Sequence, residues 1–299
     1  MGRNVAVLDF LELPDRPEKP RETGLTHVLD PGLGTEQARN RLDACGTFVD
    51  IVKLGWGTGC VTQCLTEKVA LYQDYGVPVC FGGTLFELAA LQGRIDEYVA
   101  ALVDLDIDHV EVSTGVIEMA HDRKCELIAD LSEEFVVLSE IGRKDSEEGL
   151  SSQEWGTQAA RELDAGAWKV ITEGRSSGTT GVYDAEGGVR SELIDGLTAE
   201  IAADRILFEA PRKDQQTWFI EELDSTVNLG NIDMADVVPL ETLRQGLRSD
   251  TLHMIHSNER TSHEESTREG PTDDGTTSDG TEERNRREAR LEREVTVDD

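Results

Sequence analysis

Short apolar runs alternate along the chain with longer segments in which apolar positions recur every three or four residues. The short runs are rich in β-branched residues and predict parallel strands, whereas the longer segments predict crossover helices. Strands are expected at residues 26–30, 49–54, 77–82, 109–113, 135–141, 169–173, 206–210 and 226–229. Helices are expected at residues 36–44, 67–75, 96–105, 123–131, 153–165, 191–201, 215–222 and 240–247.

Eight strand–helix repeats favour one α/β domain, a (β/α)8 TIM barrel, over residues 1–256. An open, doubly wound sheet is the alternative, but no G-x-G-x-x-G segment follows the first strand. Beyond Ser257 apolar residues are nearly absent until Leu291. Because such a segment cannot bury enough apolar surface to fold, we expect residues 257–299 to form a disordered acidic tail.

The charge composition indicates the environment and the partners of the protein. The formal net charge is −32, and the chain contains only seven lysines. This composition is typical of a halophile's cytoplasmic protein, because molar salt screens self-repulsion over about 3 Å. An acidic mesophilic protein is the alternative. We expect no nucleic-acid or membrane partner, since such a surface repels both and no apolar run approaches the ~20 residues of a membrane span. We expect a homo-oligomer.

Cysteine and histidine give no clear metal motif. The five cysteines are odd in number and lack paired zinc spacing, so we expect reduced core thiols. Cys60 and Cys64 lie four residues apart without a second pair. His27, His109 and His121 are interpreted as hydrogen-bonded structural histidines.

Charged and polar side chains gather where the predicted strands end. They are Asp30, Lys53, Glu111, Ser113, Glu140, Glu173, Glu209, Asn228 and Asn231. In a TIM barrel these strand ends meet at one face, where the active sites of this fold lie. Because buried charges are costly unless they are paired or bound to a metal, this ring predicts a site; salt bridges that merely fill the barrel are the alternative.

Cations and glycines follow the same strand ends. Arg143 and Lys144 follow the fifth strand, Arg175 the sixth, and Arg212 with Lys213 the seventh. Glycine-rich turns at residues 55–59, 82–83 and 174–181 can offer backbone N–H groups to phosphate oxygens, although glycine also simply makes tight turns. The pattern predicts a small, highly anionic substrate.

Taken together, these segments resemble the phosphosulfolactate synthase family from about Arg21 to Leu252. The matching blocks are GLTHVLDPGLG from Gly24, VDIVKLGWGTG from Val49, GGTLFE from Gly82, EVSTG from Glu111, SEIGRKD from Ser139, EGRSSGTTGVYD from Glu173, FEAPRKDQQ from Phe208, VNLGNI from Val227 and LETLRQGLRSDT from Leu240.

The resemblance implies a magnesium-dependent lyase that adds sulfite to phosphoenolpyruvate through an enolate, giving (2R)-2-O-phospho-3-sulfolactate for coenzyme M biosynthesis. A lysine suits the protonation of C2 where neighbouring cations lower its pKa. Lys144 is the first candidate for this acid and Lys53 the second. The carboxylates available to Mg²⁺ are Asp30, Glu111, Glu140, Glu173 and Glu209; the candidate substrate-binding residues are Arg143, Arg175, Ser176, Ser177, Arg212, Lys213 and Asn231.

Two other functions remain open. Family-like sequences also occur in plant heat-tolerance proteins, so a non-catalytic stress-tolerance homologue of the same fold is the first alternative. A Schiff-base aldolase that uses Lys169 is the second, although Lys169 lies early in its strand and therefore near the floor of the barrel.

Overall fold

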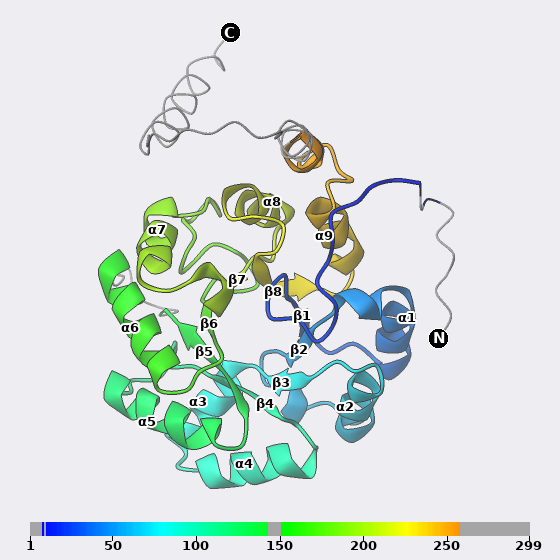
Figure 1. Ribbon diagram of the computed structural model, residues 1–299. Helices are drawn as coiled ribbons and strands as arrows, with labels where there is room; N and C mark the ends of the chain where they lie inside the picture. Colours follow the sequence, from blue (N-terminus) through cyan, green and yellow to red (C-terminus); the bar gives the residue numbers. More distant parts are fainter. Residues whose placement is uncertain (1–7, 9, 143–150, 258–299) are drawn as a thin grey trace, which may run out of the picture. The chain divides into compact units, whose positions relative to one another are not determined.

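The computed structural model describes residues 8, 10–142 and 151–257. Eight parallel strands form a nearly closed barrel surrounded by helices, so the predicted TIM barrel is confirmed (Figure 1). The strands are β1 (Thr26–Asp30), β2 (Ile51–Leu54), β3 (Val79–Phe81), β4 (His109–Val112), β5 (Val136–Ile141), β6 (Lys169–Thr172), β7 (Ile206–Glu209) and β8 (Asn228–Asp233).

All eight predicted helices are present, and α3 (Gly83–Leu91) was not predicted. The helices are α1 (Thr35–Cys45), α2 (Leu65–Asp74), α3 (Gly83–Leu91), α4 (Ile95–Asp104), α5 (His121–Ser132), α6 (Ser152–Asp164), α7 (Ser191–Glu200), α8 (Lys213–Glu222) and α9 (Val237–Arg244). Three 3-10 turns precede or follow strands: η1 (Gly46–Phe48), η2 (Thr58–Cys60) and η3 (Ala203–Arg205). The additional helix α3 begins at the second glycine of the pair at residues 82–83, which we had interpreted only as a turn.

The sheet has the order β3-β2-β1-β8-β7-β6-β5-β4. Seven strand pairs are hydrogen-bonded in parallel. β3 and β4 lie next to each other but form no ladder within the described ranges, so this seam is where the barrel is not closed by backbone hydrogen bonds.

Apolar side chains fill the middle of the barrel, separately from the larger core between the strands and the helices. The interior cluster consists of Ile51, Cys80, Leu138, Ile171 and Leu207. Since strand side chains alternate between the two faces, the residue two positions later on each strand also points inward. Four of those positions hold charged residues and one holds a glycine, and all of them lie toward the carboxyl ends of the strands. They are Lys53, Gly82, Glu140, Glu173 and Glu209.

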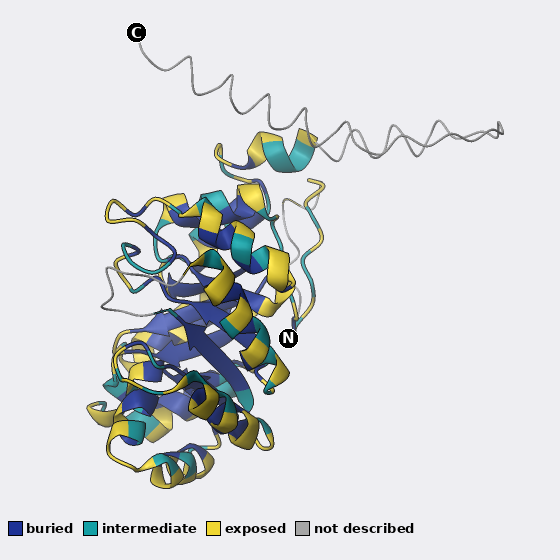
Figure 2. Cartoon of the chain, turned by 90° about the vertical axis from the view of Figure 1, so that its left-hand side faces the viewer, coloured by how far each residue is buried: buried dark blue, intermediate teal, exposed yellow. Residues whose placement is uncertain are grey.

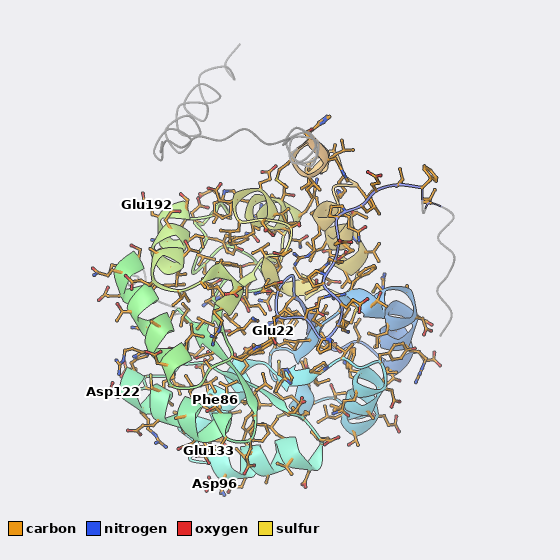
Figure 3. The ribbon with its side chains drawn as sticks, viewed as in Figure 1. Glu22, Phe86, Asp96, Asp122, Glu133 and Glu192 are labelled. Atoms are coloured by element: carbon orange, nitrogen blue, oxygen red, sulfur yellow. The ribbon has the colours of Figure 1, made fainter. Side chains whose placement is uncertain are left out.

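The outer surface carries much of the acidic charge. Figure 3 shows Asp96, Asp122, Glu133 and Glu192 at the periphery of the helical ring, and all four residues are exposed. The strands between the helices are buried (Figure 2). Within the described residues, the longest helices are too short and too polar to cross a membrane.

Cys60 is exposed on η2, so the expectation that every cysteine would be a core thiol is wrong for this residue. The predicted acidic tail lies outside the described residues, apart from Ser257, and the domain boundary remains a prediction.

A buried ion pair fastens α5 and α6 to β5. Lys124 Nζ lies 2.7 Å from Glu162 Oε1 and donates to the Glu140 carbonyl oxygen at 2.7 Å. The hydroxyl of Ser139 donates to Glu162 Oε2 at 2.7 Å, and His121 Nε2 lies 3.1 Å from Oε1. Burial would raise the pKa of the Glu162 carboxyl, but the positive charge of Lys124 and these hydrogen bonds lower it below its ordinary value.

We predict that Glu162→Gln lowers the free energy of unfolding by about 3 kcal/mol at pH 7, because it leaves Lys124 buried without its counter-ion. A folded-state pKa below the unfolded value of about 4.3 contributes stability above that value and loses it as the pH falls through the folded pKa. The difference between wild type and variant in urea denaturation should therefore shrink in acid. Glu126→Gln, an exposed control, should cost less than about 1 kcal/mol; equal losses in both variants would contradict the prediction.

Candidate active site

A cavity of about 210 Å³ opens at the carboxyl ends of the strands. Among the described residues, four carboxylates and two cations line it, together with small and polar residues. The lining consists of Leu29, Lys53, Gly55, Trp56, Gly82, Gly83, Thr84, Glu111, Glu140, Glu173, Arg175, Ser176, Glu209 and Asn231. The predicted convergence of strand-end charges in one mouth is therefore present.

Lys53 is the buried cation among these carboxylates. Its ammonium nitrogen lies 2.7 Å from Glu209 Oε1 and 3.4 Å from Glu111 Oε2. Burial would lower the pKa of Lys53, but the negative charges of Glu111, Glu209 and Glu140 raise it well above its ordinary value. The expectation that neighbouring cations would lower this pKa is thus wrong for Lys53, because its immediate neighbours are anions.

The same crowding of negative charge also acts on Glu111, where it favours the protonated carboxyl group. Burial, opposed by Lys53 and reinforced by Glu140 and Glu209, raises the pKa of Glu111 to about 7. The Gly83 N–H donates to its Oε1 atom at 2.6 Å. Four carboxylates beside two described cations give this cavity an excess of negative charge. That charge favours the binding of a divalent cation before any anionic ligand.

Three lining residues have left-handed backbone conformations that side chains rarely adopt. Trp56, Arg175 and Asn231 each have a φ of 54°. Such conformations cost about 1–3 kcal/mol each and persist where the surroundings fix them, often at functional sites. All three residues line the one cavity, although they come from different parts of the chain. Trp56 is 60% exposed and lies at the rim of the cavity.

A buried glutamate supports the site from α3, and the sequence reasoning missed it. Glu87 accepts hydrogen bonds from the backbone N–H groups of Gly115, Val116 and Ile117 at 3.1, 2.8 and 3.0 Å. The Ser113 hydroxyl lies 2.6 Å from Glu87 Oε1 and 2.9 Å from Glu140 Oε1. The available signal was a glutamate in an otherwise apolar helix, GTLFELAAL.

The structure brings together eight of the predicted site residues and separates four others from them. Lining the cavity are Lys53, Glu111, Glu140, Glu173, Arg175, Ser176, Glu209 and Asn231. Asp30, Ser177, Arg212 and Lys213 do not line it. Arg143 and Lys144 lie outside the described residues, so Lys144 as the acid and Arg143 as a substrate ligand remain predictions.

Asp30 does not line the cavity, and its oxygens already have partners, so its role as a metal ligand remains a prediction. Oδ1 accepts from the N–H groups of Gly32 and Leu33, each at 2.7 Å. Oδ2 accepts from the Tyr72 hydroxyl at 2.8 Å and lies 2.6 Å from Lys68 Nζ. Asp30 therefore fixes the turn after β1 and ties it to α2.

Three predicted substrate-binding residues also lie outside the cavity lining and pair with nearby residues, so their roles remain predictions. Lys213 pairs with Asp250 at 2.7 Å, and Arg212 pairs with Asp214 at 3.0 Å. The Ser177 hydroxyl lies 2.8 Å from Thr179 Oγ1.

Lys169, the nucleophile of the aldolase alternative, donates to the Asp204 carbonyl oxygen at 2.8 Å and lies outside the cavity lining, as its early place in β6 indicated.

Charged residues that converge at the carboxyl ends of barrel strands define the class of this protein, a TIM-barrel enzyme. Residues 14–250 match the family model of (2R)-phospho-3-sulfolactate synthase. The chain belongs to this phosphosulfolactate synthase family.

Relatives agree with the family match. The chain is 41% identical over 250 residues to a phosphosulfolactate synthase of Bacillus subtilis, covering 82% of this chain and 99% of that protein. It is 40% identical to the phosphosulfolactate synthase of Methanothermobacter thermautotrophicus, covering 84% and 99%. It is also 22% identical to the Arabidopsis thaliana protein HEAT-STRESS-ASSOCIATED 32, covering 79% and 90%.

We predict that Gly83→Ala disturbs the site, whereas Gly34→Ala does not. A Cβ atom at Gly83 would lie 2.4 Å from Ser113 Cβ and 3.1 Å from Glu111 Oε1, so the strand ends must shift apart. Overpacking of this kind costs about 1–3 kcal/mol, which urea denaturation measures. At Gly34 the nearest atom is 3.7 Å away, and φ is −69°. Indistinguishable unfolding curves for Gly83→Ala and wild type would show that the packing account is wrong.

Proposed function

We propose that this protein catalyses the Mg²⁺-dependent addition of sulfite to phosphoenolpyruvate, giving (2R)-2-O-phospho-3-sulfolactate. The observation that carries the proposal is the buried Lys53 surrounded by carboxylates at the strand ends of a chain that belongs to this family. The runner-up, a non-catalytic stress-tolerance homologue, is not favoured, because a scaffold role needs no buried cluster of like charges.

Magnesium fits the oxygen donors of the cavity. Mg²⁺ binds through one or two carboxylates while it retains several waters. The lining offers Glu111, Glu140, Glu173 and Glu209, and the buried amide oxygen of Asn231 accepts no hydrogen bond from any described residue. When bound, the ion would supply positive charge to the substrate carboxylate as that carboxylate gains electrons.

The residues of the chain are suited to charge stabilisation and positioning. Attack of sulfite on the terminal methylene carbon forms a carbon–sulfur bond and moves the alkene electrons toward the substrate carboxylate, after which C2 takes up a proton. Lys53 supplies a fixed positive charge near the developing enolate. Its raised pKa makes it a weak acid, so Lys144 is the stronger candidate for the proton donor.

Arg175 is the described cavity cation suited to the phosphate, with Ser176 beside it. We further propose a cytoplasmic enzyme adapted to high salt, on the net charge of −32.

The proposal predicts a phosphosulfonate product when purified protein is mixed with phosphoenolpyruvate, sulfite and Mg²⁺ in molar KCl. Mass spectrometry detects this product, and excess EDTA should reduce its rate of formation at least about 100-fold, because the metal supplies several kcal/mol of charge stabilisation. Lys53→Met should lower kcat at least about 100-fold through loss of a preorganised charge.

The matched control is Arg94→Met, which removes an exposed cation that pairs with Glu97 and does not line the cavity. It should leave kcat within about twofold of wild type. Wild-type turnover by Lys53→Met, or no product from the wild-type enzyme under any salt condition, would refute the assignment.

A further inference from the structure

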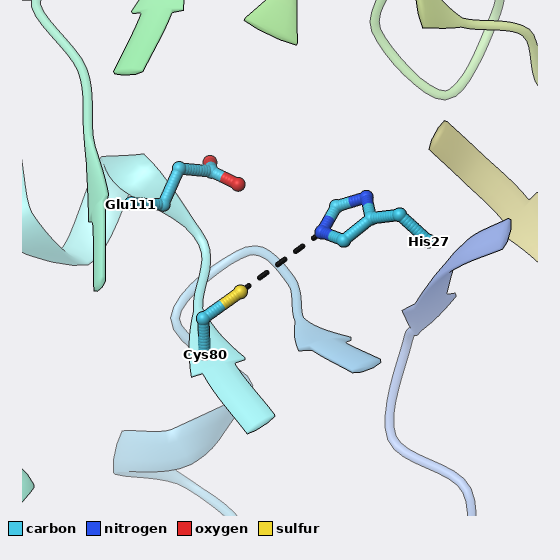
Figure 4. Close-up of side chains that lie close together, drawn as sticks. All are labelled: His27, Cys80 and Glu111. Atoms are coloured by element: carbon cyan, nitrogen blue, oxygen red, sulfur yellow. Dashed lines mark hydrogen bonds between the residues drawn. The ribbon is translucent and has the colours of Figure 1, made fainter. Parts of the chain in front are cut away.

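The open seam of the barrel lies between β3 and β4, and polar side chains meet there. Cys80 on β3 and Glu111 on β4 stand on opposite sides of the seam, and His27 reaches them from β1 (Figure 4). The imidazole Nε2 atom lies 3.9 Å from Cys80 Sγ. One ligand atom from each of the three residues lies within 4.8 Å of the others.

These side chains are buried and make few polar contacts. His27 and Cys80 are fully inaccessible, and Glu111 is 1% exposed. Cys80 Sγ contacts His27 Nε2, Glu111 Oε1 accepts from the Gly83 N–H at 2.6 Å, and Glu111 Oε2 lies 3.4 Å from Lys53 Nζ. Among the described residues, Glu111 Oε2 has no hydrogen-bond donor, and a buried polar atom of this kind costs about 1–3 kcal/mol unless a group such as a bound ion satisfies it.

Imidazole, thiolate and carboxylate are together the donor set of zinc rather than of magnesium. In tetrahedral coordination a nitrogen and a sulfur ligand lie about 3.6 Å apart, from bond lengths of ~2.0–2.1 Å and ~2.3 Å. The observed 3.9 Å needs only a small side-chain rotation.

We propose that His27, Cys80 and Glu111 form a zinc site that cross-links the strands at the open seam of the barrel. Zinc binding replaces the Cys80 S–H bond with a zinc–sulfur bond and releases the proton to solvent. Three protein ligands leave one coordination position for water. Because Glu111 also lines the cavity, the ion has a route of entry from the carboxyl ends of the strands.

This inference does not depend on the sulfite chemistry. If Glu111 binds zinc, then Glu140, Glu173 and Glu209 remain for Mg²⁺ in the cavity above it. The test therefore uses spectroscopic readouts that need no turnover, so the two proposals can fail separately.

The experiment is a Co²⁺ titration of the full chain after removal of metals, followed in the near-ultraviolet where cobalt–thiolate charge transfer absorbs. We expect one equivalent of cobalt to produce the band, and Zn²⁺ but not Mg²⁺ to displace it. Cys80→Ser should weaken cobalt binding at least about tenfold, since the loss of even an outer-shell partner costs ~10–100-fold.

Two matched variants locate the band. Cys45→Ser removes another buried thiol, whose Sγ lies 3.1 Å from the Arg41 carbonyl oxygen, and should retain the band. Cys125→Ser removes a thiol that also lies 3.9 Å from a histidine, His121. Loss of the band in Cys125→Ser but not in Cys80→Ser would overturn the proposal.

Zinc X-ray absorption of the wild-type protein gives an answer even if Cys80→Ser fails to fold. One sulfur at about 2.3 Å with nitrogen or oxygen neighbours at ~2.0–2.1 Å is expected. A zinc coordination shell of nitrogen and oxygen alone, without sulfur, would contradict the proposed site.

Discussion

The structure depends on one buried electrostatic arrangement, the ammonium group of Lys53 held between Glu209 and Glu111 at the mouth of the barrel. Removing these charges from water is expensive, and their mutual attraction offsets the cost only where the geometry is good and the remaining oxygens are hydrogen-bonded. The backbone supplies those bonds, because the N–H of Gly174 donates to Glu209 at 2.9 Å and that of Gly83 donates to Glu111 at 2.6 Å. Movement of the start of α3 or of the turn at Gly174 would break one of these hydrogen bonds.

The apolar middle of the barrel makes this arrangement possible. On β2, β5, β6 and β7 an apolar residue of the interior cluster is followed two positions later by a charged residue at the mouth. The apolar layer excludes water from below, which strengthens every charge interaction above it. Lys124 extends the support outward, since it donates to the Glu140 carbonyl oxygen and pairs with Glu162. The charged mouth and the apolar interior of the barrel are therefore built from the same strands.

Much of this arrangement could be predicted from sequence because the carboxyl ends of parallel barrel strands meet at one face. That rule, applied to the predicted strand ends, was enough to place Lys53, Glu140, Glu173 and Glu209 at one mouth. It could not tell whether Asp30 would turn toward the cavity or toward Tyr72 and Lys68, because that depends on partners distant in sequence. Helix α3 was missed because its glycine pair resembles a turn, and Glu87 was missed with it.

Electrostatic surroundings were harder to predict than positions. The sequence places cations near Lys53, whereas its close neighbours in space are carboxylates. The histidine interpretation holds for His109 and His121, which contact Asp108 and Glu162. It also holds for His27, whose Nε2 atom lies within hydrogen-bonding distance of Cys80 Sγ at 3.9 Å, a neighbour two strands away that periodicity alone does not reveal.

The most direct test of this account is the affinity for phosphoenolpyruvate measured by calorimetry with and without Mg²⁺. A cavity with four carboxylates and two described cations should reject a trianion until a divalent ion balances the charge. The account predicts that removal of Mg²⁺ weakens phosphoenolpyruvate binding at least about tenfold, since like charges in contact cost several kcal/mol. Equal affinity in Mg²⁺ and in EDTA would contradict it.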